Sequence, residues 1–164
     1  LDLPFIFFGH SMGASIAFEV CQLLGKHHRP LAKHLFLAGR QAPNRPCDLT
    51  SHHLPDDEFI EYLREKQGTP EEVLQDPDLM QLLLPRLRAD FQLNDHYQPY
   101  QHPRLPIPIT VYAGTDEEGE RIDFADWAKQ TSSSFELQYL KGSHFFINDH
   151  IPAIIQDIIN KSAT

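Results

Sequence analysis

The stretch FIFFGHSMGASIAF, residues 5–18, decides the fold class because it places a serine between two glycines where two patterns meet. The apolar run 5–8 predicts a buried strand, and the apolar spacing from Gly13 onward predicts a helix. A sharp strand-to-helix turn strains the serine backbone, so we expect glycine at positions 9 and 13, where a Cβ would clash. The pattern G-x-S-x-G at such a turn is typical of a nucleophile elbow with Ser11 as the nucleophile.

Strands and helices are predicted to alternate on both sides of a central interruption. The first helix runs to about Leu24 and ends at Gly25, and HLFLAG, residues 34–39, predicts the next strand. Later in the chain, strands are expected at 107–113 and 135–140, with helices near 124–130 and 151–160. This order predicts an α/β fold in which helices flank a parallel sheet.

The interruption, about residues 48–104, shows no strand-like run. Three helix starts are marked by proline and acidic residues, at 55–58, 69–72 and 76–78, and acidic first turns suit the helix dipole. We therefore expect a single, partial α/β domain over residues 1–164 that carries a helical lid insertion.

Composition excludes several classes of function. The 164 residues carry 14 Lys and Arg against 23 Asp and Glu, and a net charge of −9 argues against nucleic acid or a membrane surface as partner. With only Cys21 and Cys47, reduced thiols are expected. No run is long and apolar enough for a membrane span, and no leader is evident, so a cytoplasmic protein is predicted.

A serine nucleophile needs a histidine as base and an acid that orients the histidine. Among ten histidines, His144 follows a late strand in the glycine-containing loop LKGSHFF, and we expect it to be the base. His150 is the alternative, but it falls at the start of the last helix. No metal or cofactor is expected, because the histidine pairs 27–28 and 52–53 lack the spacing of a metal site.

The acid is expected after the strand that ends at Ala113, where AGTDEEGE supplies adjacent carboxylates. Asp116 is preferred and Glu117 remains open, because spacing does not separate neighbouring loop positions. The backbone N–H of Met12, at the helix start, is the expected oxyanion donor.

A second oxyanion donor normally follows an earlier strand. Since only Leu1 to Pro4 precede the first apolar run, we expect the chain to be the C-terminal portion of an α/β-hydrolase fold. A catalytically inactive fragment is one reading of such a chain.

Four segments resemble the type II thioesterases of nonribosomal peptide and polyketide synthesis, which belong to the α/β-hydrolase superfamily: GHSMGA (9–14), LPDDEFIEYLREKQGTPEEVLQDPDLMQLLLPRLRADF (54–91), WAKQTSSSF (127–135) and GSHFFI (142–147). The resemblance implies a serine thioesterase with Ser11 as nucleophile, His144 as base and Asp116 as acid. It also implies a partner, a carrier protein bearing an acyl-phosphopantetheine thioester. The acid loop is one residue shorter than is usual in the family, which keeps Glu117 open. A carboxylesterase or lipase is the alternative hydrolase.

Overall fold

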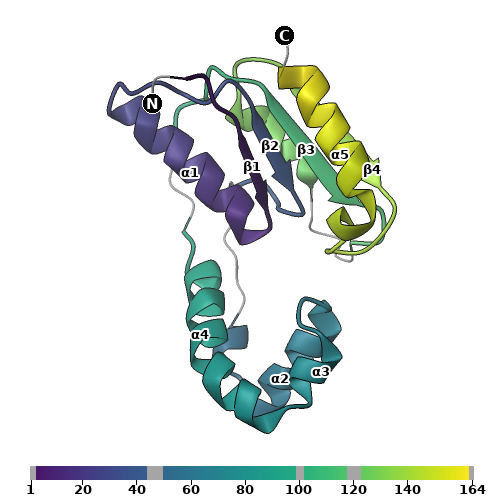
Figure 1. Cartoon of the computed structure of the whole chain (residues 1–164). Coiled ribbons are helices and arrows are strands. Elements are labelled where there is room, and N and C mark those ends of the chain that lie inside the picture. Colours follow the sequence, from purple (N-terminus) through teal and green to yellow (C-terminus); the bar gives the residue numbers. More distant parts are fainter. Residues whose placement is uncertain (1–2, 44–49, 99–101, 118–122, 163–164) are drawn as a thin grey trace. The chain divides into compact units, whose positions relative to one another are not determined.

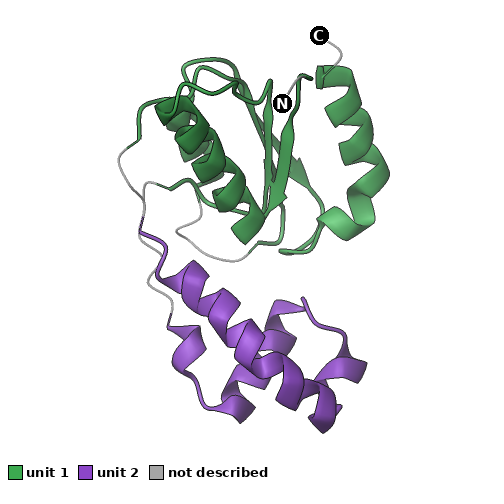
Figure 2. Cartoon of the chain, turned by 60° about the vertical axis from the view of Figure 1, so that its left-hand side comes forward, with its two compact units in different colours: residues 1–44, 100–164 green, residues 45–99 purple. Residues whose placement is uncertain are grey.

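The structure, a computed structural model, describes residues 3–43, 50–98, 102–117 and 123–162. The chain forms two compact units (Figure 2): a sheet unit of residues 1–44 and 100–164, and a helical unit of residues 45–99. The predicted insertion had boundaries at about 48 and 104. Position 48 lies outside the described residues, and residues 102–104 belong to the sheet unit.

The sheet unit is built on four parallel strands in the order β1-β2-β3-β4 (Figure 1). Their bounds are β1 Phe7–His10, β2 Leu35–Ala38, β3 Ile109–Gly114 and β4 Phe135–Leu140. Since all pairs are parallel, the carboxyl ends of the four strands lie along one edge of the sheet. The predicted α/β class with a parallel sheet is confirmed.

Helices cover both faces of this sheet (Figure 2). On one face α1 (Met12–Lys26) and the 3₁₀ helix η2 (Phe124–Gln130) pack in a cluster that includes Phe18, Trp127 and Val111. On the other face α5 (Ile147–Ser162) packs Ile154 against Phe36 and Tyr112. Consecutive strand residues point to opposite faces, so each of the short apolar strands can contribute side chains to both clusters.

Two buried groups support this core. The Tyr112 hydroxyl donates to Asp157 Oδ2 at 2.6 Å, which ties β3 to α5. Cys21 is a free thiol inside the first cluster, and burial raises the pKa of this thiol to about 11. Cys47 lies outside the described residues.

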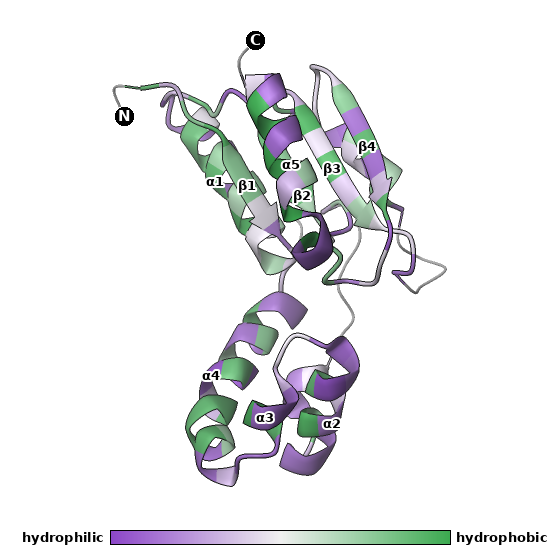
Figure 3. Ribbon diagram, turned by 45° about the vertical axis from the view of Figure 1, so that its right-hand side comes forward, coloured by the Kyte–Doolittle hydropathy of each residue, from purple (hydrophilic) through white to green (hydrophobic). Residues whose placement is uncertain are grey.

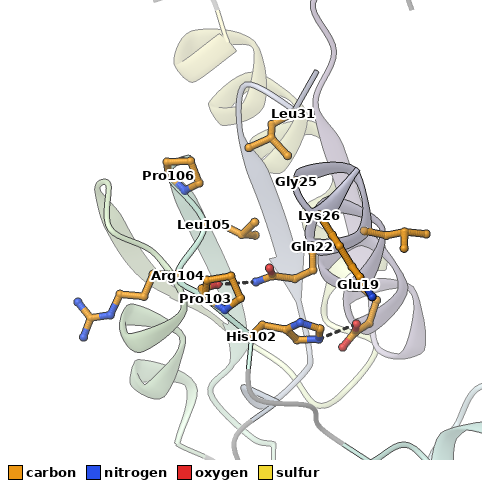
Figure 4. A pocket seen from close by; sticks show the side chains of 11 residues that line it. Glu19, Gln22, Gly25, Lys26, Leu31, His102, Pro103, Arg104, Leu105 and Pro106 are labelled. Atoms are coloured by element: carbon orange, nitrogen blue, oxygen red, sulfur yellow. Dashed lines mark hydrogen bonds and ion pairs between the residues drawn. The ribbon is translucent and has the colours of Figure 1, made fainter. Parts of the chain in front are cut away.

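A groove of about 730 Å³ runs along α1 where the chain re-enters the sheet unit (Figure 4). Gln22 Nε2 donates to the Pro103 carbonyl at 2.9 Å, and His102 Nε2 lies 2.9 Å from Glu19 Oε2. Neither Ser11 nor His144 lines the groove. These contacts fasten the returning segment to α1, away from the serine turn.

The helical unit has a small core of its own. It contains η1 (Ser51–His53), α2 (Asp56–Lys66), α3 (Glu71–Leu74) and α4 (Pro77–Asp95). As its sequence predicts, Asp76 caps α4 by accepting from the N–H groups of Asp78 and Leu79. The core side chains are Phe59, Leu63, Leu74 and Met80.

The serine turn has the strained geometry that its sequence predicts. Ser11 sits between β1 and α1 with φ 54° and ψ −121°, values that few residues other than glycine adopt. A Cβ on Gly9 would lie 2.3 Å from the Gly13 carbonyl oxygen, whereas a Cβ on Gly13 would meet no atom within 4 Å. The predicted clash of an added Cβ is therefore confirmed for Gly9 and wrong for Gly13. In this turn the backbone of Gly13 lies against the Cβ position of Gly9, whereas the Cβ position of Gly13 is open.

Two glycine substitutions test this asymmetry. We expect Gly9→Ala to destabilise the protein by about 1–3 kcal/mol or more, because backbone atoms must move to admit the methyl group. Gly13→Ala should be neutral or stabilising by up to about 1 kcal/mol, since alanine favours the helix. Denaturant unfolding of both variants measures the difference, and equal stabilities would contradict the turn geometry.

Candidate active site

Three side chains from distant parts of the sequence meet at the carboxyl edge of the sheet. Ser11 follows β1, Glu117 lies in the loop after β3, and His144 lies in the loop after β4. His144 Nε2 is 3.0 Å from Ser11 Oγ, and His144 Nδ1 is 3.1 Å from Glu117 Oε1. The structure thus brings the predicted serine and histidine within hydrogen-bonding distance.

The hydrogen-bond pattern assigns the tautomer of His144. An ionised carboxylate only accepts, so Nδ1–H donates to Glu117 and leaves Nε2 as the acceptor facing the Ser11 hydroxyl. In this arrangement the imidazole can take a proton from the hydroxyl while the carboxylate stabilises the resulting positive charge. The chemistry available to such a trio is nucleophilic attack by serine on an acyl carbon.

Glu117, rather than the preferred Asp116, faces His144. The Asp116 carboxylate is exposed and accepts from Thr115 Oγ1 at 2.9 Å, while the Asp116 N–H donates to the Gly142 carbonyl at 2.9 Å. The Asp116 backbone therefore holds the loop that carries His144, and its side chain turns outward. The Glu117 side chain is 4% exposed and reaches inward. The carboxylate that faces His144 is therefore that of Glu117, the alternative left open by spacing, and not that of Asp116.

Gly39, just after β2, makes room for this carboxylate. It has φ +58°, and a Cβ there would lie 3.2 Å from Glu117 Oε1 and 2.9 Å from His10 Nε2. Glu117 Oε2 is buried, with no hydrogen-bond partner among the described residues. A carboxylate held this way has His144 as its main polar neighbour.

His150, the alternative base, lies within α5 and does not face Ser11. Its Nε2–H donates to the Lys141 carbonyl at 2.9 Å, which anchors the start of the His144 loop. The sequence predicts that His150 lies in the last helix rather than in a loop, and the structure confirms this position.

The N–H of Met12 is the first of α1 and has no intrahelical acceptor. It is adjacent in sequence to Ser11, at the positive end of the helix dipole, where negative charge is stabilised. This position suits the predicted oxyanion donor.

Within the described ranges, no group of three His, Cys, Asp or Glu side chains is arranged to hold a metal ion. Of the two histidine pairs in the sequence, 27–28 and 52–53, the second includes His52, whose Nδ1 lies 2.8 Å from Asp95 Oδ2. No helix in the described part of the chain has the length and apolar character needed to cross a bilayer.

The two neighbouring acids provide a matched test of the geometry. Glu117→Gln should slow modification of Ser11 by a fluorophosphonate by about 10²- to 10⁴-fold, because the amide does not stabilise a charged imidazole. Asp116→Asn should change the rate by about 2-fold or less, as for an exposed position. Rate constants from gel fluorescence measure both effects, and the reverse ranking would restore Asp116.

Comparison with known proteins gives the family of this chain. The thioesterase domain model matches residues 2–162. The gramicidin S biosynthesis protein GrsT of Aneurinibacillus migulanus is 42% identical over 149 residues, covering 90% of this chain and 58% of that protein. Thioesterase PikA5 of Streptomyces venezuelae is 37% identical over 153 residues, covering 93% of this chain and 54% of that protein.

A solved structure, the type II thioesterase BorB from the borrelidin biosynthetic cluster, superposes with a TM-score of 0.86 at 32% identity. The match covers 98% of this chain and 66% of BorB. The chain thus spans a little over half the length of GrsT and PikA5. On the family match and the shared α/β-hydrolase fold, this chain belongs to the thioesterase domain family.

Proposed function

We propose that the protein hydrolyses acyl thioesters held on the phosphopantetheine arm of acyl or peptidyl carrier proteins. The observation that carries the proposal is the hydrogen-bonded series Ser11–His144–Glu117 in a chain of the thioesterase domain family. The relatives named for gramicidin S biosynthesis and for the borrelidin cluster support a role in nonribosomal peptide or polyketide synthesis. We also propose that the protein acts in the cytoplasm, as its sequence predicts.

In the proposed reaction His144 Nε2 removes the proton of Ser11 as Oγ attacks the thioester carbonyl. The Met12 N–H donates to the developing oxyanion, and Glu117 stabilises the imidazolium. The C–S bond then breaks, and the imidazolium returns its proton to the departing phosphopantetheine thiolate. Water, deprotonated by His144, attacks the acyl-Ser11 ester, and the carboxylic acid leaves with Ser11 restored.

We further propose that the helical unit supplies apolar surface to the acyl group of the substrate, as the predicted lid would. Along α4 hydrophobic and hydrophilic residues alternate (Figure 3), and three leucines stay exposed although the unit has its own core. Their exposed fractions are 43% for Leu79, 75% for Leu82 and 62% for Leu93. Covering such side chains with an acyl chain is favourable.

The function is tested with an octanoyl-phosphopantetheinyl carrier protein from a peptide synthetase. Intact-mass spectrometry should show loss of the octanoyl group on addition of the whole gene product that contains these residues. Ser11→Ala should leave the carrier acylated, because the attacking oxygen is gone. A matched octanoyl oxygen ester assayed in parallel separates the two hydrolase classes. Cleavage of the oxygen ester with an intact acyl carrier would assign a carboxylesterase and contradict the proposal.

A second test addresses the exposed leucines. Leu82→Ser should raise KM for an octanoyl thioester by about 10-fold and leave KM for an acetyl thioester unchanged, because only the longer chain needs apolar cover. Gln81→Ser, at the adjacent exposed position, is the control and should affect neither substrate. Equal effects of Leu82→Ser on both substrates would argue against this role of α4.

A further inference from the structure

His10 is the last residue of β1 and directly precedes Ser11, yet the reaction proposed above does not use it. Its Nε2 lies 2.8 Å from the carbonyl oxygen of His144. Because a carbonyl oxygen only accepts, Nε2 must carry the proton and donate it. Two adjacent residues thus contact His144: Ser11 faces its imidazole, and His10 donates to its backbone carbonyl.

The loop that carries His144 is held from two sides. On the β3 side, the Asp116 N–H holds the Gly142 carbonyl at 2.9 Å, and His150 of α5 holds the Lys141 carbonyl. On the β1 side, His10 Nε2 donates to the His144 carbonyl at 2.8 Å. Among these backbone anchors, the bond from His10 acts on the carbonyl of the residue whose imidazole must reach Ser11, while Glu117 contacts the imidazole itself.

Packing reinforces the hydrogen bond. The His10 ring centroid is 4.8 Å from that of His144 and 5.5 Å from that of Phe145. Gly39 leaves the space that the His10 ring occupies, since a Cβ there would lie 2.9 Å from His10 Nε2. Ring and loop therefore fit together with little freedom to shift.

The pKa of His10 favours an uncharged ring, which still donates through its Nε2–H. Burial lowers the pKa of His10, and the neighbouring His144 lowers it further, while the bond to the His144 carbonyl and the charge of Glu117 act in the opposite direction. The net shift is downward, so His10 is neutral at neutral pH. A neutral ring adds no positive charge beside His144 when that imidazole accepts the proton of Ser11.

We propose that His10 is a positioning residue, which sets the distance between His144 Nε2 and Ser11 Oγ by holding the His144 backbone carbonyl. The proposal rests on the proposed function, because it assigns His10 a part in the same reaction. A bond of 2.8 Å from the residue beside the nucleophile leaves the His144 loop little room to drift. Displacement of a reacting group by about 1 Å is enough to cost about 100-fold in rate.

Three substitutions separate this role from simple packing. His10→Gln keeps an N–H donor at about the reach of Nε2, His10→Asn keeps the same donor on a shorter side chain, and His10→Ala removes it. We expect His10→Asn and His10→Ala to lower kcat for an octanoyl thioester and the fluorophosphonate rate constant by about 10- to 100-fold, with KM unchanged. His10→Gln should recover most of both rates.

Thermal unfolding of the variants, made in the whole gene product, reports the packing contribution separately. Equal rates for His10→Gln and His10→Asn at similar unfolding temperatures would overturn the proposal, as would wild-type rates in His10→Ala. Wild-type protein that is unreactive toward both probes, or a Ser11→Ala variant that is still labelled at the wild-type rate, would contradict the proposed function itself. The two failures are therefore distinguishable.

Discussion

The hydrogen bond between Ser11 Oγ and His144 Nε2 joins residues 133 positions apart, and the site depends on it. It forms because β1, β3 and β4 are parallel, so that the residues after each strand emerge at one edge of the sheet. The strained Ser11 backbone then lifts the hydroxyl off the end of β1 toward the loop after β4. Fold and chemistry thus share one constraint, the alignment of the carboxyl ends of the strands.

Much of the fold could be predicted from local pattern. The β4 prediction, 135–140, matches the observed bounds, and the last helix differs from prediction mainly in starting earlier, at Ile147. The Asp76 cap of α4 was predictable because the side chain bonds to N–H groups only two and three residues further along the chain. The start of β3 was harder to predict from the sequence. The apolar run begins at Ile107, whereas the strand begins at Ile109, after Pro108.

The site was predictable where order along the chain determines it and unpredictable where side-chain direction does. Ser11 and His144 follow from motif and loop position. The choice between Asp116 and Glu117 depends on which of two adjacent residues the turn directs inward, and spacing carries no such information. The bond from His10 to a carbonyl 134 positions away has no sequence signal beyond its place beside the nucleophile.

The proposed mechanism requires that Ser11 become acylated during turnover. The most direct measurement is peptide mass spectrometry of protein quenched in acid while it consumes an octanoyl thioester. We expect an octanoyl group on the peptide that contains Ser11, at a level that rises when water attack is slowed. Thioester consumed by wild-type protein with no acylated Ser11 at any quench time, or with acyl on another residue, would contradict it.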